Sequence, residues 1–244
     1  MLKHSFTFLC LLILAGCAQV PQSKVDDRDP LQSINRPLYD FNMDVLDAYL
    51  LRPVAVGYVE VTPVPVRNGI VNFTGNITAP VDMINAGLQG KPGNASVSLA
   101  RFLVNSTVGI FGIFDVASSL GLEIVDEDFG QTLGVWGVGD GAYLMLPGMG
   151  PTTARNLTGD VVDNFFVLPE VALTTPQTIL VFVLKAVEAR ASLIPQEGLL
   201  NDSLDPYLFV KDIYFQRQIY ELYDGNPPIK EEPADFDEDF LESL

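Results

Sequence analysis

The sequence predicts a mostly α-helical domain, on three observations. Apolar residues recur at helical spacing in several long segments. Proline and aspartate stand where helices would begin, and proline or glycine stands where they would end. Few segments show the period of two that is typical of half-buried strands. We therefore expect one helical domain over residues 31–225, preceded by an export signal and a tether and followed by an acidic tail.

The amino terminus has the pattern of a bacterial lipoprotein signal. Lys3 precedes an apolar run over residues 6–14, which is too short to span roughly 30 Å of hydrocarbon as a helix. Small residues then lead directly to Cys17, the pattern that a lipoprotein signal peptidase cleaves once the thiol carries lipid. We expect residues 1–16 to be removed and Cys17 to be the site of lipid attachment.

The residues after Cys17 indicate where the lipoprotein goes. Ala18 and Gln19 stand where an aspartate usually retains a lipoprotein in the inner membrane, so the outer membrane is the expected destination. Each buried methylene of an acyl chain adds about 0.8 kcal/mol, so the three chains of a mature lipoprotein give a durable anchor. Residues 17–30 combine proline with polar side chains and predict a flexible tether.

Cleavage of the signal excludes several classes of chemistry. It removes Cys10, so Cys17 is the one cysteine left and no internal disulfide can form. It also removes His4, the single histidine of the chain, so the mature protein has no imidazole for a catalytic triad or a zinc site. We expect no enzyme activity, no metal and no cofactor.

The charge excludes polynucleotide partners. The full chain carries −17, and the loss of Lys3 makes the mature charge −18. Seven carboxylates lie in the last fourteen residues, so we expect residues 226–244 to be a disordered acidic tail. The remaining body repels nucleic acid phosphates. It is nevertheless apolar, since 48% of the full chain is hydrophobic and 18% is charged.

The first half of the domain predicts a series of amphipathic helices. Apolar residues at helical spacing predict a helix over residues 31–51 that stops at Pro53. Residues 66–90 predict two short helices that are separated near Ala79-Pro80, and Pro92 begins a longer one.

Two further helices are expected in the second half. An apolar one runs from about Gln177 to Ala191. The last has Asp205 as its cap and Pro206 in its first turn, and it ends before Gly225.

Residues 102–122 form an apolar stretch whose setting the sequence leaves open. Its one charge is Asp115, and Gly109 and Gly112 are two of its three glycines. The length suits a membrane span, but Asn105 and Asp115 would be costly against lipid, and the glycines favour tight bends or close helix contact. A buried core hairpin, a re-entrant pair embedded in the membrane and a true span are the alternatives.

Seven glycines lie between Gly130 and Gly150, interleaved with aromatic and aliphatic residues. The absence of a lysine and of a strand-turn-helix frame argues against a nucleotide loop. A plain glycine-rich loop and a backbone that lines an amphipathic passage both stay open. Just before them, residues 126–128 are three consecutive acidic residues, which predict a solvated helix start rather than a metal site.

Many ordered positions resemble a known family, the MlaA (also called VacJ) outer-membrane lipoproteins. The resemblance covers residues 29–223, nearly the whole mature domain. The matching positions are Asp29-Pro30-Leu31, Asn35-Arg36, Phe41-Asn42, Asp47, Asn72-Phe73, Arg101-Phe102-Leu103-Val104-Asn105, Gly112 to Asp115, Asp128 to Gly134, Tyr143, Pro147, Gly150-Pro151 and Asp205-Pro206-Tyr207.

The resemblance implies a ring of mostly amphipathic helices, partly embedded in the periplasmic leaflet of the outer membrane around a channel for phospholipids. It also implies association with trimeric porins, and transfer of lipid to a periplasmic carrier and then to an inner-membrane ABC transporter complex. Together with the patterns above it predicts ten channel or membrane-embedded residues: Phe41, Asn42, Asn105, Asp115, Gly134, Gly137, Gly139, Gly141, Tyr143 and Arg155.

Two other classes of function remain open. One is a structural adaptor that binds porins or the cell envelope without conducting lipid. The other is a phospholipase, for which the sequence offers no paired nucleophile and base.

The apolar body generates a first testable prediction, that the domain itself enters the membrane. The Cys17→Ser protein, which lacks the acyl chains, should still require detergent for extraction and purification. The measurement is phase partitioning and size-exclusion chromatography with and without detergent. A variant that is freely soluble and monodisperse in buffer would contradict embedding and favour the tethered adaptor.

Overall fold

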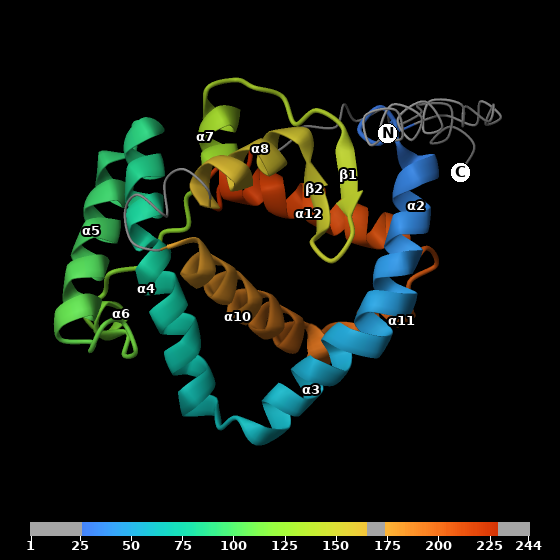
Figure 1. The fold of residues 1–244 in the computed structure, drawn as a ribbon. Coiled ribbons are helices and arrows are strands. Elements are labelled where there is room, and N and C mark those ends of the chain that lie inside the picture. Colours follow the sequence, from blue (N-terminus) through green and yellow to red (C-terminus); the bar gives the residue numbers. More distant parts are fainter. Residues whose placement is uncertain (1–25, 165–173, 229–244) are drawn as a thin grey trace, which may run out of the picture.

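A computed structural model describes residues 26–164 and 174–228. The predictions for the signal, for Cys17 and for most of the acidic tail lie outside these residues. Within them the chain is mostly helical, as predicted (Figure 1). The elements are α2 (Gln32–Asp40), η1 (Phe41–Leu51), α3 (Arg52–Val61), α4 (Val64–Leu88), α5 (Pro92–Thr107), α6 (Val116–Ser119), α7 (Phe129–Val135), β1 (Tyr143–Leu146), β2 (Gly150–Thr153), α8 (Ala154–Val162), α10 (Thr175–Leu193), η3 (Ile194–Gln196), α11 (Glu197–Asn201) and α12 (Pro206–Leu222).

The first helix is longer than predicted, because α2, η1 and α3 form one continuous helix. Its middle part, η1, is a π-helix, and the N–H of Arg52 bonds to the carbonyl of Asp47, five residues back. Pro53 does not end the helix. It lies in the first turn of α3, where the hydrogen bonds change from π-helical to α-helical spacing. The N–H that proline lacks is tolerated there, as it is at the start of a helix.

The break predicted near Ala79-Pro80 is also wrong, since α4 is a single helix with Pro80 buried inside it. Helix α4 packs against α5 along one side and against α10 on another. This tertiary packing overrides the local preference of proline for a helix end. The start at Pro92, the apolar helix α10 and the cap of α12 by Asp205, which accepts from the Leu208 N–H, are confirmed.

Residues 102–122 are divided between the end of α5, a turn and the short α6, so they do not form one membrane span. The core-hairpin alternative is wrong as well, because the turn exposes its apolar side chains, and Phe111 is 73% exposed. Gly112 has φ +88°, and a Cβ there would lie 2.4 Å from the Cβ of Asn76. The turn therefore needs this glycine to fold against α4.

The segment from Gly130 to Gly150 is more regular than a glycine-rich loop. It contains α7 and the first strand of an antiparallel hairpin, in which Tyr143 pairs with Thr153 and Leu146 with Gly150. The side chain of Asp128 caps α7, as predicted for an acidic helix start. Its neighbour Glu127 is not solvated, however. It is 2% exposed and bonds to the ammonium of Lys91 at 3.0 Å.

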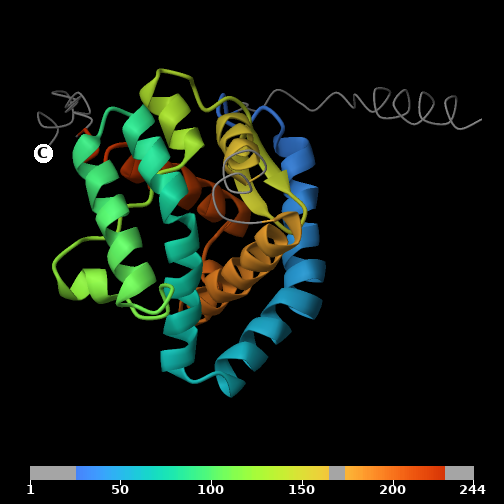
Figure 2. The same ribbon diagram turned by 60° about the vertical axis from the view of Figure 1, so that its left-hand side comes forward.

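The helices are arranged as a ring, and helix α10 crosses its interior. The continuous α2–η1–α3 helix and α4 form two limbs that meet at the α3–α4 turn, and α10 lies between them (Figures 1 and 2). Two ion pairs fix α10 to the limbs: Arg190 to Asp47 at 2.5 Å and Arg67 to Glu188 at 2.9 Å. The expected ring of helices is thus present in the described part of the chain.

The hairpin lies at the open end of the ring, against an aromatic core. Tyr39 of α2, Tyr143 and Met145 of β1, and Tyr207 and Phe215 of α12 form this core, with edge contacts between their rings. Beneath it lies Asp29, which is fully buried.

Strand β1 is held along its outer edge by side chains of the first helix. Asn35 donates to the carbonyl of Tyr143 at 2.9 Å and to Asp29 at 2.8 Å, and it accepts from the N–H of Met145 at 3.0 Å. Further along the same helix, Asn42 donates to the carbonyl of Leu146 and accepts from the N–H of Gly148, both at 2.9 Å. These asparagines satisfy the backbone groups that an edge strand would otherwise leave open.

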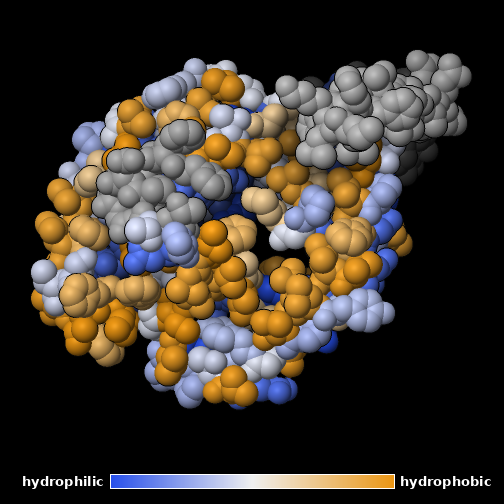
Figure 3. Space-filling view, in the orientation of Figure 1, coloured by the Kyte–Doolittle hydropathy of each residue, from blue (hydrophilic) through white to orange (hydrophobic). Residues whose placement is uncertain are grey.

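The outer surface of the ring has wide apolar areas. Figure 3 shows hydrophobic side chains over wide areas of one face and around an opening near its middle. Exposed large apolar side chains lie on α3 (Val54, Val59, Val61), at the start of α4 (Val64, Val66), on the turn after α5 (Val108, Ile110, Phe111, Phe114) and on α10 (Ile179, Leu180, Phe182, Val183). Over residues 26–164 and 174–228, no helix has both the length and the hydrophobicity to cross a membrane.

The asparagine contacts generate the second prediction. Asn35→Ala should lower the free energy of unfolding by about 1–3 kcal/mol, because it leaves buried backbone groups of β1 and the carboxylate of Asp29 without a partner. Thermal and denaturant unfolding of the detergent-purified protein measures this. Asn226→Ala, at an exposed position, is the control. If the two variants had equal free energies of unfolding, the contacts of Asn35 with β1 would not stabilise the fold as we expect.

Candidate functional site

A cavity of about 530 Å³ lies between α4, α5 and α10. We name it the α4–α10 cavity. Its wall is mixed. Apolar side chains such as Ile70 and Leu184 alternate with polar ones such as Thr74 and Thr78 on the same helix faces. This wall can contact both the chains and the polar head of an amphipathic molecule.

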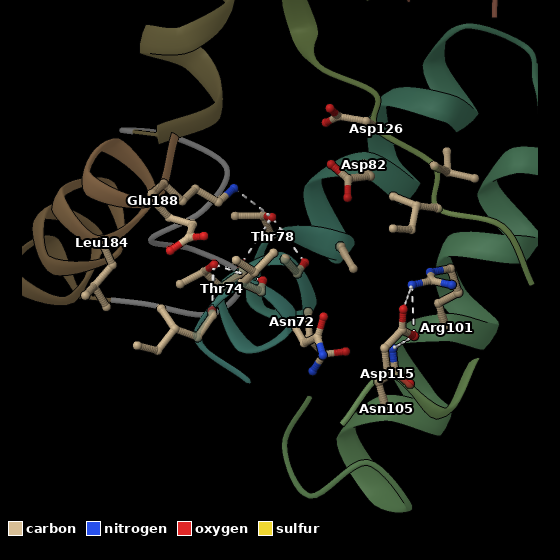
Figure 4. Close-up of a pocket in the computed structure, with 18 of the residues that line it drawn as sticks. Asn72, Thr74, Thr78, Asp82, Arg101, Asn105, Asp115, Asp126, Leu184 and Glu188 are labelled. Carbon is tan, nitrogen blue, oxygen red and sulfur yellow. Dashed lines mark hydrogen bonds and ion pairs between the residues drawn. The ribbon is translucent and has the colours of Figure 1, made fainter. Parts of the chain in front are cut away.

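One end of the α4–α10 cavity is acidic. Asp82 of α4 and Asp126 lie side by side there (Figure 4). Burial, with repulsion from Asp126 as the next cause, raises the pKa of the Asp82 carboxyl to about 8. Lys185 of α10 opposes this rise, and its ammonium bonds to the hydroxyl of Thr78 at 3.2 Å.

The other end contains two of the ten predicted residues, Asn105 and Asp115. One terminal nitrogen of Arg101, Nη2, donates to both carboxylate oxygens of Asp115 at 3.0 Å each, and Asn105 donates to the same carboxylate at 3.0 Å. Burial would raise the pKa of Asp115, but the bonds from Ser118, Asn105 and Arg101 outweigh it and lower the pKa to about 2. These two residues therefore fix the turn after α5 while they line the cavity (Figure 4).

A second cavity, of about 330 Å³, lies between the hairpin, α8 and α12. We name it the hairpin cavity. Leu146, Met149 and Pro151 of the hairpin form its apolar side. Its polar side contains Gln131 of α7 and Tyr214 of α12 together with several carboxylates. Asp126 lines both this cavity and the α4–α10 cavity.

A third cavity, of about 630 Å³, lies where the first helix meets α11 and the start of α12. Its charged residues pair with one another. Arg190 binds Asp47 and also Glu197 at 2.6 Å, and Glu197 binds Arg52 at 3.1 Å. This cavity is part of the joint that fixes α10 to the ring.

Five of the predicted residues come together in a structural joint. Arg155 is buried, and its guanidinium binds Asp140 at 2.7 Å and the carbonyl of Val138 at 3.3 Å. A Cβ at Gly134 would lie 3.1 Å from this guanidinium. Arg155 thus holds the loop that contains Gly137, Gly139 and Gly141. None of these five residues lines the three cavities.

The remaining predicted residues occupy different settings. Tyr143 is fully buried in the aromatic core, and Asn42 holds the hairpin turn. Phe41 is 42% exposed at the start of η1. A lining role for the glycine-rich segment stays a prediction, and in the described chain the cavity residues of this segment are Gln131, Leu146 and Met149.

Asp82 and the polar face of α4 were not predicted from the sequence. A signal for the latter was present, because Asn72, Thr74, Asn76 and Thr78 recur along an otherwise apolar helix. Polar side chains on an apolar helix need partners or a cavity.

The chain belongs to the MlaA lipoprotein family, whose pattern matches residues 27–221. A relative from Escherichia coli (strain K12), named an intermembrane phospholipid transport system lipoprotein, is 39% identical over 236 residues, which is 95% of this chain and 93% of the relative. A relative of the same name from Haemophilus influenzae is 35% identical over 222 residues, or 89% of each chain.

The fold of this family is also shared. A structure solved in a study of the structural basis for maintenance of bacterial outer membrane lipid asymmetry aligns with a TM-score of 0.74 and 41% identity. The match covers 81% of this chain and 99% of the other.

The loop held by Arg155 generates the third prediction. Gly141 has φ +70°, and a Cβ there would lie 3.0 Å from the Cβ of Ala154, so Gly141→Leu should destabilise the fold by on the order of 1 kcal/mol or more. Gly139→Leu is the matched control, because nothing described lies within 4 Å of a Cβ there. Thermal unfolding of both variants measures the difference. Equal melting temperatures of the two variants would contradict the expected backbone strain and close contact at position 141.

Proposed function

We propose that this protein is an outer-membrane lipoprotein that removes phospholipids from the outer leaflet and passes them toward the periplasm, which maintains the lipid asymmetry of the membrane. The α4–α10 cavity carries the proposal. It offers one molecule both apolar and polar walls inside a ring whose exterior is apolar. The names of the relatives, which are intermembrane phospholipid transport system lipoproteins, support the same substrate class.

The exposed apolar surface supports a position partly embedded in one leaflet. Apolar side chains on α3, on the turn after α5 and on α10 would be costly in water but stable against acyl chains. We place this ring in the periplasmic leaflet, with the lipid on Cys17 as its anchor. The pair formed by the end of α5 and its exposed turn then enters the leaflet without crossing it.

Lipid transport by this ring needs partners on both sides. We propose that a trimeric porin positions the ring in the leaflet. A soluble periplasmic carrier then receives the lipid and delivers it to an inner-membrane ABC transporter complex. Release to a carrier requires no bond to be broken in the lipid, so the proposal includes no catalytic step.

The fourth prediction fills the cavity with one side chain. Gly75 lines the α4–α10 cavity, and nothing described lies within 4 Å of a Cβ there. Gly75→Trp should therefore occupy the cavity without displacing the backbone of α4. We expect the variant to fold and to reach the membrane, and phospholipid to accumulate on the cell surface as we expect it to do in cells that lack the protein.

The measurement is surface-exposed phospholipid, detected with an impermeant probe that reacts with head groups, in cells that express each variant at the normal level. The control is Gly87→Trp, the same substitution on an exposed position of the same helix, with the same open space around its Cβ. Normal clearance by a stable Gly75→Trp protein would contradict conduction through this cavity. It would favour the non-conducting adaptor.

A further inference from the structure

Asp82 is the last of three polar side chains that follow one face of α4. Thr74, Thr78 and Asp82 are spaced four residues apart, and all three line the α4–α10 cavity (Figure 4). The hydroxyls of the two threonines donate to carbonyls of their own helix, at 2.9 Å and 3.2 Å. Because each hydroxyl has one proton, the threonines offer a molecule in the cavity only acceptor oxygens. A donor on this face has to come from Asp82.

Asp82 also differs from the paired carboxylates of the same wall. Asp115 and Glu188 each pair with an arginine, at 3.0 Å and 2.9 Å. Asp82 makes no hydrogen bond or ion pair with any described residue, although it is partly buried. Its carboxyl is therefore available to a molecule that enters the cavity.

The charges that face Asp82 favour its protonated form. Helix α4 has no other carboxylate. The groups that face Asp82 from neighbouring elements are three carboxylates and one ammonium: Asp126 and Glu127 before α7, Asp163 after α8, and Lys185 of α10. On α5, which packs along α4, the charged group of the cavity wall is Arg101, and it is bound to Asp115 at the other end.

The result is a carboxyl that titrates close to neutral pH. Burial is the largest cause, and repulsion from Asp126 is the next, so that the pKa of Asp82 is raised to about 8. Figure 4 shows the two side chains next to each other at this end of the cavity. Asp82 therefore keeps its proton at pH 7 and loses it in mildly alkaline solution.

The two forms of Asp82 act in opposite ways on a phosphate. A carboxylic acid has an O–H that can donate to a phosphate oxygen, whereas a carboxylate can only accept and repels an anion. Lys185 is close enough to act on the titration of Asp82, so an anion beside the protonated carboxyl also has a cation near it. Ionisation of Asp82 would cancel that positive charge.

We propose that protonated Asp82 binds the phosphate of a phospholipid in the α4–α10 cavity, and that ionisation of Asp82 weakens this binding. The inference rests on the proposed lipid transport, to which it adds a residue that contacts the head group and a dependence on pH. On ionisation the proton passes to water, and the bond from the carboxyl O–H to the phosphate is replaced by repulsion between two anions.

The test uses the full-length acylated protein, purified in mild detergent and mixed with equal amounts of phosphatidylcholine and of diacylglycerol with the same acyl chains. Phosphatidylcholine has a phosphate but no group that titrates near pH 8, and diacylglycerol has no phosphate. Lipid that stays bound is quantified by mass spectrometry from about pH 6 to about pH 10. We expect the ratio of bound phosphatidylcholine to diacylglycerol to fall about tenfold as the pH rises past about 8, since a hydrogen bond to a charged group is lost.

Two variants separate a binding role from a structural one. Asp82→Asn keeps an N–H donor and cannot ionise, so it should hold a constant ratio across this pH range. Asp126→Asn removes a charge that raises the pKa of Asp82, so the fall should begin at a lower pH. The control is Asp40→Asn, which removes an exposed charge from the third cavity and should leave the profile of the wild type unchanged. Thermal unfolding at each pH verifies that every variant is folded.

Three results would each overturn this inference: a constant ratio in the wild type, a wild-type fall in Asp82→Asn, or an unshifted fall in Asp126→Asn. All three leave the transport function intact if Gly75→Trp still blocks clearance. Normal clearance with Gly75→Trp, by contrast, removes the transport function on which the inference rests. The two failures are therefore distinguishable.

Discussion

The position of one short strand controls much of this structure. Strand β1 has a strand neighbour on one side only, and its other edge is satisfied by Asn35 and Asn42 of the first helix. The same Asn35 reaches the buried Asp29, which also accepts from the hydroxyl of Tyr207 and pairs with Lys211. This network ties together the first helix, the hairpin and the last helix. Two of these parts, the hairpin and the last helix, line the hairpin cavity.

The ring separates two kinds of environment that a phospholipid needs at once. Its exterior presents aliphatic and aromatic side chains, whereas its interior concentrates acidic groups such as Asp82 and Asp126. Ion pairs such as Arg190 with Asp47 keep α10 in place between the limbs. The packing of α4 against α5 and α10 also holds the ring together.

The sequence predicted the helices well where periodicity and capping agree, as at Pro92 and at Asp205 with Pro206. It failed at Pro53 and Pro80, because the π-helical spacing and the packing of α4 override the local preference of proline. The hairpin was missed since four-residue strands are too short to show alternation. Asn105 and Asp115 were predicted as channel or membrane-embedded residues, and the structure places both in the wall of the α4–α10 cavity. Asp82 could not be predicted as a cavity residue, because its raised pKa comes from burial and from neighbours such as Asp126 that are distant in sequence.

The asparagine contacts have a consequence for how the chain folds. Asn35 and the backbone of Tyr143 are separated by 108 residues, and Asn42 and Leu146 by 104. Bringing such distant segments together costs loop-closure entropy before any contact compensates it. The first helix is therefore synthesised long before β1, and Asn35 and Asn42 have no strand to bind until that part of the chain follows.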